Sequence, residues 1–194
     1  MLLLFGALAI AMWYFTSLFL QNVLGYSALG AGLAQTPAAV MFVLVARLAA
    51  ALLPRTSMRA LMLAGSGFFL AGFGWLAQAH ACSSYLTNLL TPTLLVAAGI
   101  GLTFPTLMSV ATGSVPEADA GIMGGLANTA TQVGGSAGLA VLAAAASGRA
   151  AMEAGRSSPA AALAAGYDLV FLTAVGLGLA LALLSAACRV RPAR

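Results

Sequence analysis

The sequence contains no lysine, one histidine, two cysteines and only four acidic residues among its 194 residues. With eight arginines, charged residues make up 6% of the chain, whereas a soluble globular domain carries about 25%. So few charges cannot cover a water-exposed surface, which excludes an ordinary soluble enzyme and a disordered tail. Two cysteines are also too few for a disulfide framework.

Signals for cofactor, metal or nucleic-acid binding are missing as well. The net charge of +4 is scattered between apolar runs instead of gathered on one face, so it does not indicate nucleic-acid binding. No cluster of cysteines and histidines surrounds His80, and no glycine-rich loop carries a lysine, so we expect neither a metal nor a nucleotide. The chain instead has 62% hydrophobic residues and a mean hydropathy of +1.03, which indicate a lipid bilayer as its solvent.

Six apolar runs are long enough to cross a membrane, because about 20 helical residues span a hydrocarbon core of about 30 Å. Only helices satisfy their own backbone polar groups in lipid without pairing to another segment. The sequence therefore predicts an all-α membrane protein, a six-transmembrane-helix bundle over residues 1–188 with a basic tail at 189–194. The first run is too long for a signal peptide and no basic residue precedes it, so we interpret it as a span. The predicted spans are 2–24, 30–53, 60–79, 89–110, 121–146 and 169–188.

The arginines predict the orientation. Arg55 and Arg59 lie in the loop between the second and third spans, and three more arginines lie in the C-terminal tail. The long connection between the fifth and sixth spans holds Arg149 and Arg156, together with Glu153. Because arginine is enriched in cytoplasmic loops, both termini are expected in the cytoplasm.

Other polar residues are then placed by this topology. Cys82 and His80 are expected outside and Cys188 inside, which prevents a disulfide within one chain. Asp168 is expected at the start of the sixth span, and the other carboxylates in loops. Arg47 lies about two turns from Pro54, and we expect its guanidinium to reach the headgroups instead of lining a pore.

Glycines and amides interrupt the fifth span more than any other. The pairs Gly121/Gly125 and Gly134/Gly138 have the spacing that lets another helix approach closely. Asn128 and Gln132 are four residues apart and so lie on one helix face. These amides either hydrogen-bond to a neighbouring helix or line a cavity, and the pattern alone leaves both interpretations open. Further polar candidates in the first two spans are Tyr14, Gln21 and Gln35.

The segment Gly135-Ser136-Ala137-Gly138 superficially resembles the nucleophile motif of intramembrane serine proteases. Such a serine needs a histidine base within hydrogen-bond reach inside the membrane. The single histidine, His80, is predicted in an outer loop, whereas Ser136 is deep in a span. We therefore expect the protein not to be an enzyme.

Several motifs in order resemble the drug:proton antiporters of the major facilitator superfamily that have fourteen spanning helices. Residues 14–37, YFTSLFLQNVLGYSALGAGLAQTP, resemble the signature YLxLYLQxVLGYSPLxAGLxxLP. Residues 99–105 resemble GLGLGxxFP, residues 115–121 resemble VPPEEAG, and residues 128–138 resemble NTxRQxGGxxG. The resemblance covers nearly the whole chain, but it is to the last six helices of the family only.

The departures from the family pattern concern single positions. Thr131 stands where the family usually has arginine, and Ala28 where it commonly has proline. The predicted cytoplasmic loop keeps two basic positions, Arg55 and Arg59, of the family's DRxGRR motif but lacks its aspartate and glycine. This weakens the case for a gating role of the loop.

The resemblance implies the C-terminal half of a multidrug efflux transporter, a multi-pass protein of the bacterial plasma membrane. Such transporters have two six-helix halves with the substrate between them, so the missing N-terminal half is the expected partner, as a separate subunit or in the same longer chain. The cavity wall is expected from the first, second, fourth and fifth spans, with Tyr14, Gln21, Gln35, Asn128 and Gln132 as contacts for small lipophilic or cationic molecules. The coupling acid is expected in the other half. The alternative is a membrane scaffold or assembly protein derived from such a transporter.

Overall fold

The computed structural model describes residues 1–80, 84–113 and 115–187, and all regular structure within them is helical. It contains six helical stretches long and apolar enough to cross a membrane. The first combines α1, the π-helical turn η1 and α2; the fourth combines the π-helical η2 with α5; the fifth begins with the short 3₁₀ helix η3. The bounds are α1 Leu2–Ile10, η1 Ala11–Phe15, α2 Thr16–Asn22, α3 Ala28–Leu52, α4 Met58–Leu76, η2 Tyr85–Leu90, α5 Thr91–Thr112, η3 Glu117–Asp119, α6 Ala120–Glu153 and α7 Pro159–Ala187.

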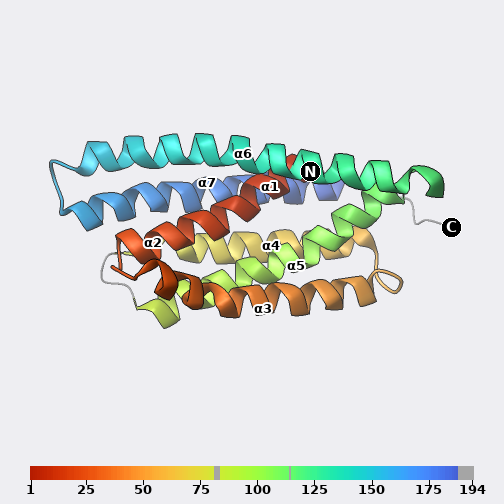
Figure 1. Ribbon diagram of the computed structural model, residues 1–194, viewed down its shortest axis with the longest axis horizontal. Coiled ribbons are helices and arrows are strands. Elements are labelled where there is room, and N and C mark those ends of the chain that lie inside the picture. Colours follow the sequence, from red (N-terminus) through yellow and green to blue (C-terminus); the bar gives the residue numbers. More distant parts are fainter. Residues whose placement is uncertain (81–83, 114, 188–194) are drawn as a thin grey trace.

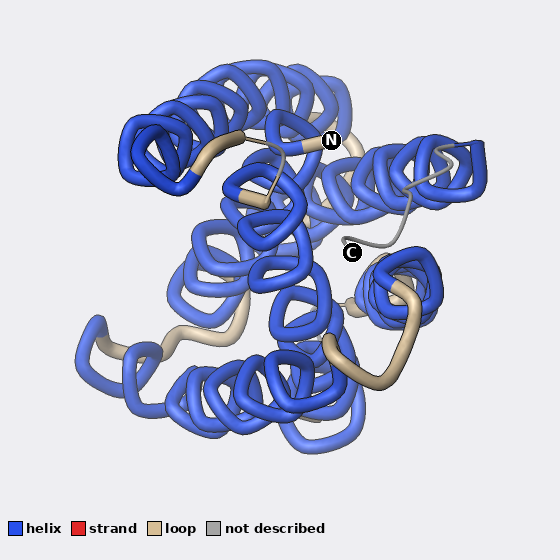
Figure 2. Tube along the Cα trace, turned by 90° about the vertical axis from the view of Figure 1, so that its right-hand side faces the viewer, coloured by secondary structure: helices blue, strands red, loops and turns tan. Residues whose placement is uncertain are grey.

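The helices run alternately up and down along the long axis (Figure 1). The α2–α3 and α6–α7 connections lie at one end, and the α3–α4 connection, the start of α6 and Met1 lie toward the other. Neighbouring helices follow the order α1, α6, α7, α4, α5, α3, and the end-on view shows them as one bundle of helices (Figure 2). This all-α, six-helix arrangement is the predicted fold class.

A serine side chain caps the N-terminus of three of the helices. The hydroxyl of Ser27 accepts a hydrogen bond from the backbone N–H of Gly30 at 3.1 Å, and that of Ser57 accepts one from Ala60 at 3.2 Å. Ser158 accepts from the N–H of Ala161 at 3.3 Å at the start of α7. These bonds satisfy N–H groups that a helix leaves without an internal partner.

The first four helical stretches end within about four residues of the predicted spans, but the last two helices differ. α6 continues to Glu153 and α7 already begins at Pro159, so the predicted long connection shrinks to residues 154–158. Arg149 and Glu153, predicted in that connection, lie in the last turns of α6 and form an i,i+4 ion pair at 3.2 Å. Asp168, predicted at a helix start, lies inside α7.

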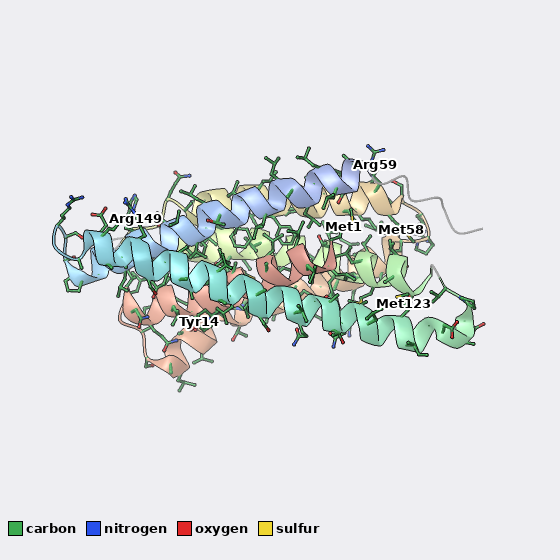
Figure 3. The ribbon with its side chains drawn as sticks, turned by 90° about the horizontal axis from the view of Figure 1, so that it is seen from above. Met1, Tyr14, Met58, Arg59, Met123 and Arg149 are labelled. Carbon is green, nitrogen blue, oxygen red and sulfur yellow. The ribbon has the colours of Figure 1, made fainter. Side chains whose placement is uncertain are left out.

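The physical reason is the alanine content of both segments. Alanine has the highest helix propensity, so residues beyond the membrane length continue the helix, and Pro159 suits a first helical position because its missing N–H is not needed there. The estimate of about 20 residues per span measures the hydrocarbon core and not the helix. α6 and α7 therefore extend together beyond the predicted spans, with Arg149 at one end of the bundle and Arg59 at the other (Figure 3).

The helices pack most closely where glycine removes a side chain. A Cβ at Gly6 would collide with the backbone of Thr131, and one at Gly134 with the backbone of Leu3. This close approach holds α1 parallel against α6. In the buried core, ring contacts join Phe69 to Phe73 within α4 and Phe73 to Phe171 of α7, with centroids 6.3 and 6.4 Å apart.

Burial is uneven among the helices. In the most apolar stretch of the η2–α5 span 56% of residues are buried, compared with 22% in the α6 span and 11% in α3. The glycine contacts and the aromatic core therefore lie on the inner faces, and most of α3 and α6 faces away from the bundle.

Candidate functional site

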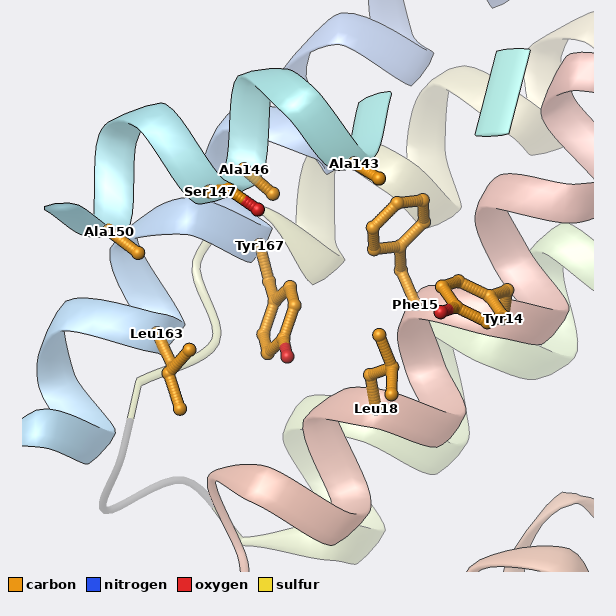
Figure 4. Close-up of a pocket in the computed structure, with 9 residues that line it drawn as sticks. All are labelled: Tyr14, Phe15, Leu18, Ala143, Ala146, Ser147, Ala150, Leu163 and Tyr167. Atoms are coloured by element: carbon orange, nitrogen blue, oxygen red, sulfur yellow. The ribbon is translucent and has the colours of Figure 1, made fainter. Parts of the chain in front are cut away.

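A small cavity lies where the first span diverges from α6, with α7 as the third wall. Its volume is about 170 Å³ and nine side chains surround it (Figure 4). Phe15, Ala146 and Tyr167 are buried, whereas Tyr14 and Ser147 are exposed. The remaining lining residues are Leu18, Ala143, Ala150 and Leu163.

The π-helical turn η1 supplies two of the aromatic side chains. A π turn holds one residue more per hydrogen-bonded ring than an α turn, and such turns are frequent at functional sites. Tyr14 and Phe15 leave this turn with their rings edge to face and their centroids 5.2 Å apart. The α6 wall opposite is made of alanines and one serine, which are too small to fill the space.

Tyr167 of α7 is fixed by three contacts. Its ring lies 6.2 Å from that of Phe15 and 6.0 Å from that of Phe19. Its hydroxyl accepts a hydrogen bond of 3.1 Å from the side-chain amide of Asn22 at the end of α2. The first and last spans are thereby joined beside the cavity.

Of the five polar residues predicted to line a substrate cavity, Tyr14 lies at this one. The side-chain N–H of Gln21 donates to the hydroxyl of Ser17 in its own helix at 3.0 Å. Gln35 is half-buried in α3, which contacts α5 and α2. Asn128 and Gln132 are exposed on α6. The structure therefore places one member of the predicted set at the cavity, one in a bond within α2, and three on the outward-facing helices α3 and α6.

The four glycines predicted to mediate packing are also divided. Gly134 and Gly138 lie against α1, and a Cβ on Gly138 would come 2.6 Å from the Cβ of Ala7. Gly121 and Gly125 have open space where a Cβ would lie. The first pair therefore belongs to a helix contact within the bundle, and the second lies on a surface that the described chain does not cover.

The other lining residues were not predicted from the sequence: Phe15, Leu18, Ser147, Leu163, Tyr167 and three alanines of α6. The alanine-rich end of α6 was present in the sequence as a signal of a wall without large side chains. From the sequence alone, this signal could not be assigned to a cavity, because the fold is needed to place these alanines opposite the aromatic residues of η1 and α7.

No charged side chain in the described part of the chain lines the cavity. Arg55 and Arg59 are exposed around the α3–α4 connection. Asp168, inside α7, interacts electrostatically with the exposed His80, which follows α4. Among the described residues, no three His, Cys, Asp or Glu side chains are grouped to hold a metal ion. Cys82, Cys188 and the basic tail lie outside the described residues.

Six apolar helices of membrane length define an integral, multi-pass membrane protein. The model of the Major Facilitator Superfamily matches residues 1–139, and the chain belongs to this family of membrane transporters. It is similar to the cephamycin export protein CmcT of Amycolatopsis lactamdurans, with 39% identity over 136 residues, 70% of this chain and 28% of that protein. It is also similar to the puromycin resistance protein pur8 of Streptomyces alboniger, with 34% identity over 128 residues, 64% of this chain and 25% of that protein. The matched part of this chain thus spans little more than a quarter of the length of these relatives.

Proposed function

We propose that the chain forms the C-terminal half of a multidrug efflux transporter of the fourteen-helix drug:proton antiporter branch. Family membership and two relatives named for export and for antibiotic resistance support this proposal. The six spans are one half of the two-half architecture of facilitator-type transporters. The cargo class is small lipophilic or cationic molecules, because the chain carries few charged residues and its two relatives are named for export and for antibiotic resistance.

The observation that carries the proposal is the exposure of polar groups on the two least buried helices. Asn128, Gln132 and Ser136 lie on the outward face of α6, and Thr36 is exposed on α3. Amides in contact with hydrocarbon are costly, so we infer that these faces meet another protein surface or a water-filled cavity. The missing N-terminal half, in the same longer chain or as a separate subunit, supplies that surface.

The same arrangement favours a coupling acid in the missing half. Proton coupling needs an ionisable group within the membrane. Glu117, Asp119 and Glu153 lie at the ends of helices, and Asp168 lies beside His80 near the α4–η2 connection. None of these four carboxylates belongs to the cavity.

For the orientation we propose a bacterial plasma membrane with both termini in the cytoplasm. Arg55 and Arg59 belong to the α3–α4 connection and the first turn of α4, at the end of the bundle toward which the N-terminus also lies (Figure 1). Arg149 lies at the opposite end (Figure 3). Arg156, just after α6, belongs to the same side as Arg149, so the arginine excess that favours the first side as cytoplasmic comes from the three arginines of the C-terminal tail, which are expected there.

The test is transport of ethidium, a lipophilic cation, into vesicles with an imposed pH gradient. The chain alone is expected to give no proton-driven flux. The chain assembled with the polypeptide that carries the remaining spans is expected to transport. Flux from the chain alone would contradict the half-transporter proposal, and a folded two-part assembly without flux would favour a scaffold.

Variants of the assembled transporter test the wall itself. Gln132→Leu is expected to reduce transport, because its amide lies on the exposed face of α6 that we propose is turned toward the missing N-terminal half. Gln78→Leu is the matched control, since Gln78 lies just after α4 and donates to the carbonyl of Gly74 at 3.1 Å. Equal transport by both variants would show that Gln132 does not contribute to the transport pathway.

A further inference from the structure

We infer that the cavity between η1, α6 and α7 binds one uncharged aromatic ring of a small molecule. The inference starts from its size. An enclosed cavity of about 150 Å³ lined by apolar side chains binds benzene. The space here has a volume of about 170 Å³ and opens to the surface beside Tyr14 and Ser147. The space therefore accepts one ring and is too small for a fused polycyclic molecule.

The lining favours an aromatic ring over other groups of the same size. Tyr14, Phe15 and Tyr167 surround the space on two sides (Figure 4). Aromatic pairs gain stabilisation from edge-to-face and offset arrangements beyond the burial of their area. The alanines of α6 form a flat opposite wall.

The polar atoms at the cavity suit a neutral ligand. The lining contains no charged side chain, only the hydroxyls of Tyr14, Ser147 and Tyr167. The Tyr167 oxygen accepts the bond from Asn22, which leaves its own hydrogen for a further acceptor. A ring with one oxygen or nitrogen substituent is therefore preferred over a ring with a formal charge.

A lipid acyl chain is the competing occupant of an apolar site in a membrane. The cavity is short, because Phe15, Ala146 and Tyr167 close its inner side. An extended chain would leave most of its length outside, whereas a ring is enclosed by the aromatic side chains. The site therefore selects the ring.

The inference that this cavity binds a ring does not depend on the proposed transport function. The further statement that the ring is part of a transported molecule does rest on it. Binding itself is tested without transport, so the two fail separately. Labelling in the cavity without ethidium flux through the two-part assembly would contradict the transporter proposal alone. Flux without labelling would contradict this inference alone.

The experiment uses the full chain in lipid nanodiscs, illuminated with phenyl azide as an uncharged photoreactive ring. Mass spectrometry locates the label. We expect it on η1 and on the facing parts of α6 and α7, with competition by toluene and none by octane. Competition by octane to the same extent would assign the site to acyl chains.

Two adjacent alanines give a matched pair of variants. Ala143 lines the cavity, whereas Ala144 is exposed on the same helix. Ala143→Leu fills the space and is expected to lower cavity labelling about tenfold, equivalent to about 1.4 kcal/mol. Ala144→Leu is expected to leave it unchanged.

A second variant keeps the inference testable if Ala143→Leu fails to fold. Tyr14→Leu removes a ring from the exposed rim without adding volume, and is expected to lower labelling while the nanodisc-bound chain keeps its helical circular dichroism. Equal labelling of the wild type, Ala143→Leu and Tyr14→Leu would overturn the inference.

Discussion

The side-chain amide of Asn22 donates a hydrogen bond of 3.1 Å to the hydroxyl of Tyr167, 145 positions further along the chain. It joins the end of the first span to the last helix, at a point where α2 makes few other contacts with α7. Because the Tyr167 ring is also a wall of the cavity, this bond sets the position of the ring.

Removing this bond is expected to destabilise the bundle modestly. Hydrogen bonds between side chains of membrane helices average about 0.6 kcal/mol in double-mutant cycles. Tyr167→Phe and Asn22→Leu should each lower the thermal stability in detergent, and the double variant should be less destabilised than their sum. Strict additivity would mean that the bond contributes nothing. Gln21→Leu is the control, because Gln21 bonds within its own helix.

The contact between α1 and α6 predicts a large difference between two glycines. A Cβ on Gly134 overlaps the backbone of Leu3, which cannot move without shifting α1. Overpacking of this kind costs about 1–3 kcal/mol, so Gly134→Ala should lower stability by about that amount in thermal unfolding.

Gly125→Ala is the matched control on the same helix. Its Cβ meets open space, and alanine is the better helix former by about 1 kcal/mol. In the chain alone this variant should be neutral or stabilising. In the assembled transporter it should weaken assembly if the exposed face of α6 contacts the other half. Destabilisation of the isolated chain by both variants to the same degree would contradict the register of α1 on α6.

The fold class followed from the sequence because lipid imposes one strong rule, about 20 apolar residues per crossing. The rule says nothing about helix beyond the hydrocarbon, which is why the extensions carrying Arg149 and Asp168 were not predicted. It also treats all apolar residues alike. The contact of Gly134 with Leu3 depends on the register between α1 and α6. The hydrophobic pattern of one helix does not determine its register with another helix.

The candidate site was less accessible to the same reasoning. Tyr14 was selected as a polar interruption of an apolar run, but its cavity depends on the π turn at Ala11–Phe15 and on alanines about 130 residues away. From the sequence alone, Asn128 and Gln132 fit either a hydrogen bond to a neighbouring helix or a cavity wall. Their exposure on α6 becomes informative only beside the low burial of that helix.

The ion pair between Arg149 and Glu153 is expected to contribute little. The two side chains are 45% and 23% exposed, and exposed i,i+4 pairs contribute about 0.3–0.5 kcal/mol. Arg149→Gln should change the free energy of unfolding by no more than this amount, and the difference should vanish in high salt. A loss several times larger would show that Arg149 has a role beyond the pair, such as binding at the end of the bundle.

The orientation is tested by single cysteines in a chain with Cys82 and Cys188 replaced by alanine. Ala118 and Ala154 are both exposed, in η3 before α6 and just after α6. α6 is long enough to cross the membrane, so the two positions lie on opposite sides. Under the arginine rule, an impermeant maleimide added to intact cells should label Ala154→Cys and not Ala118→Cys, and permeabilisation should make both reactive. Labelling of Ala118→Cys alone in intact cells would invert the topology, and labelling of both would mean that α6 does not span the membrane.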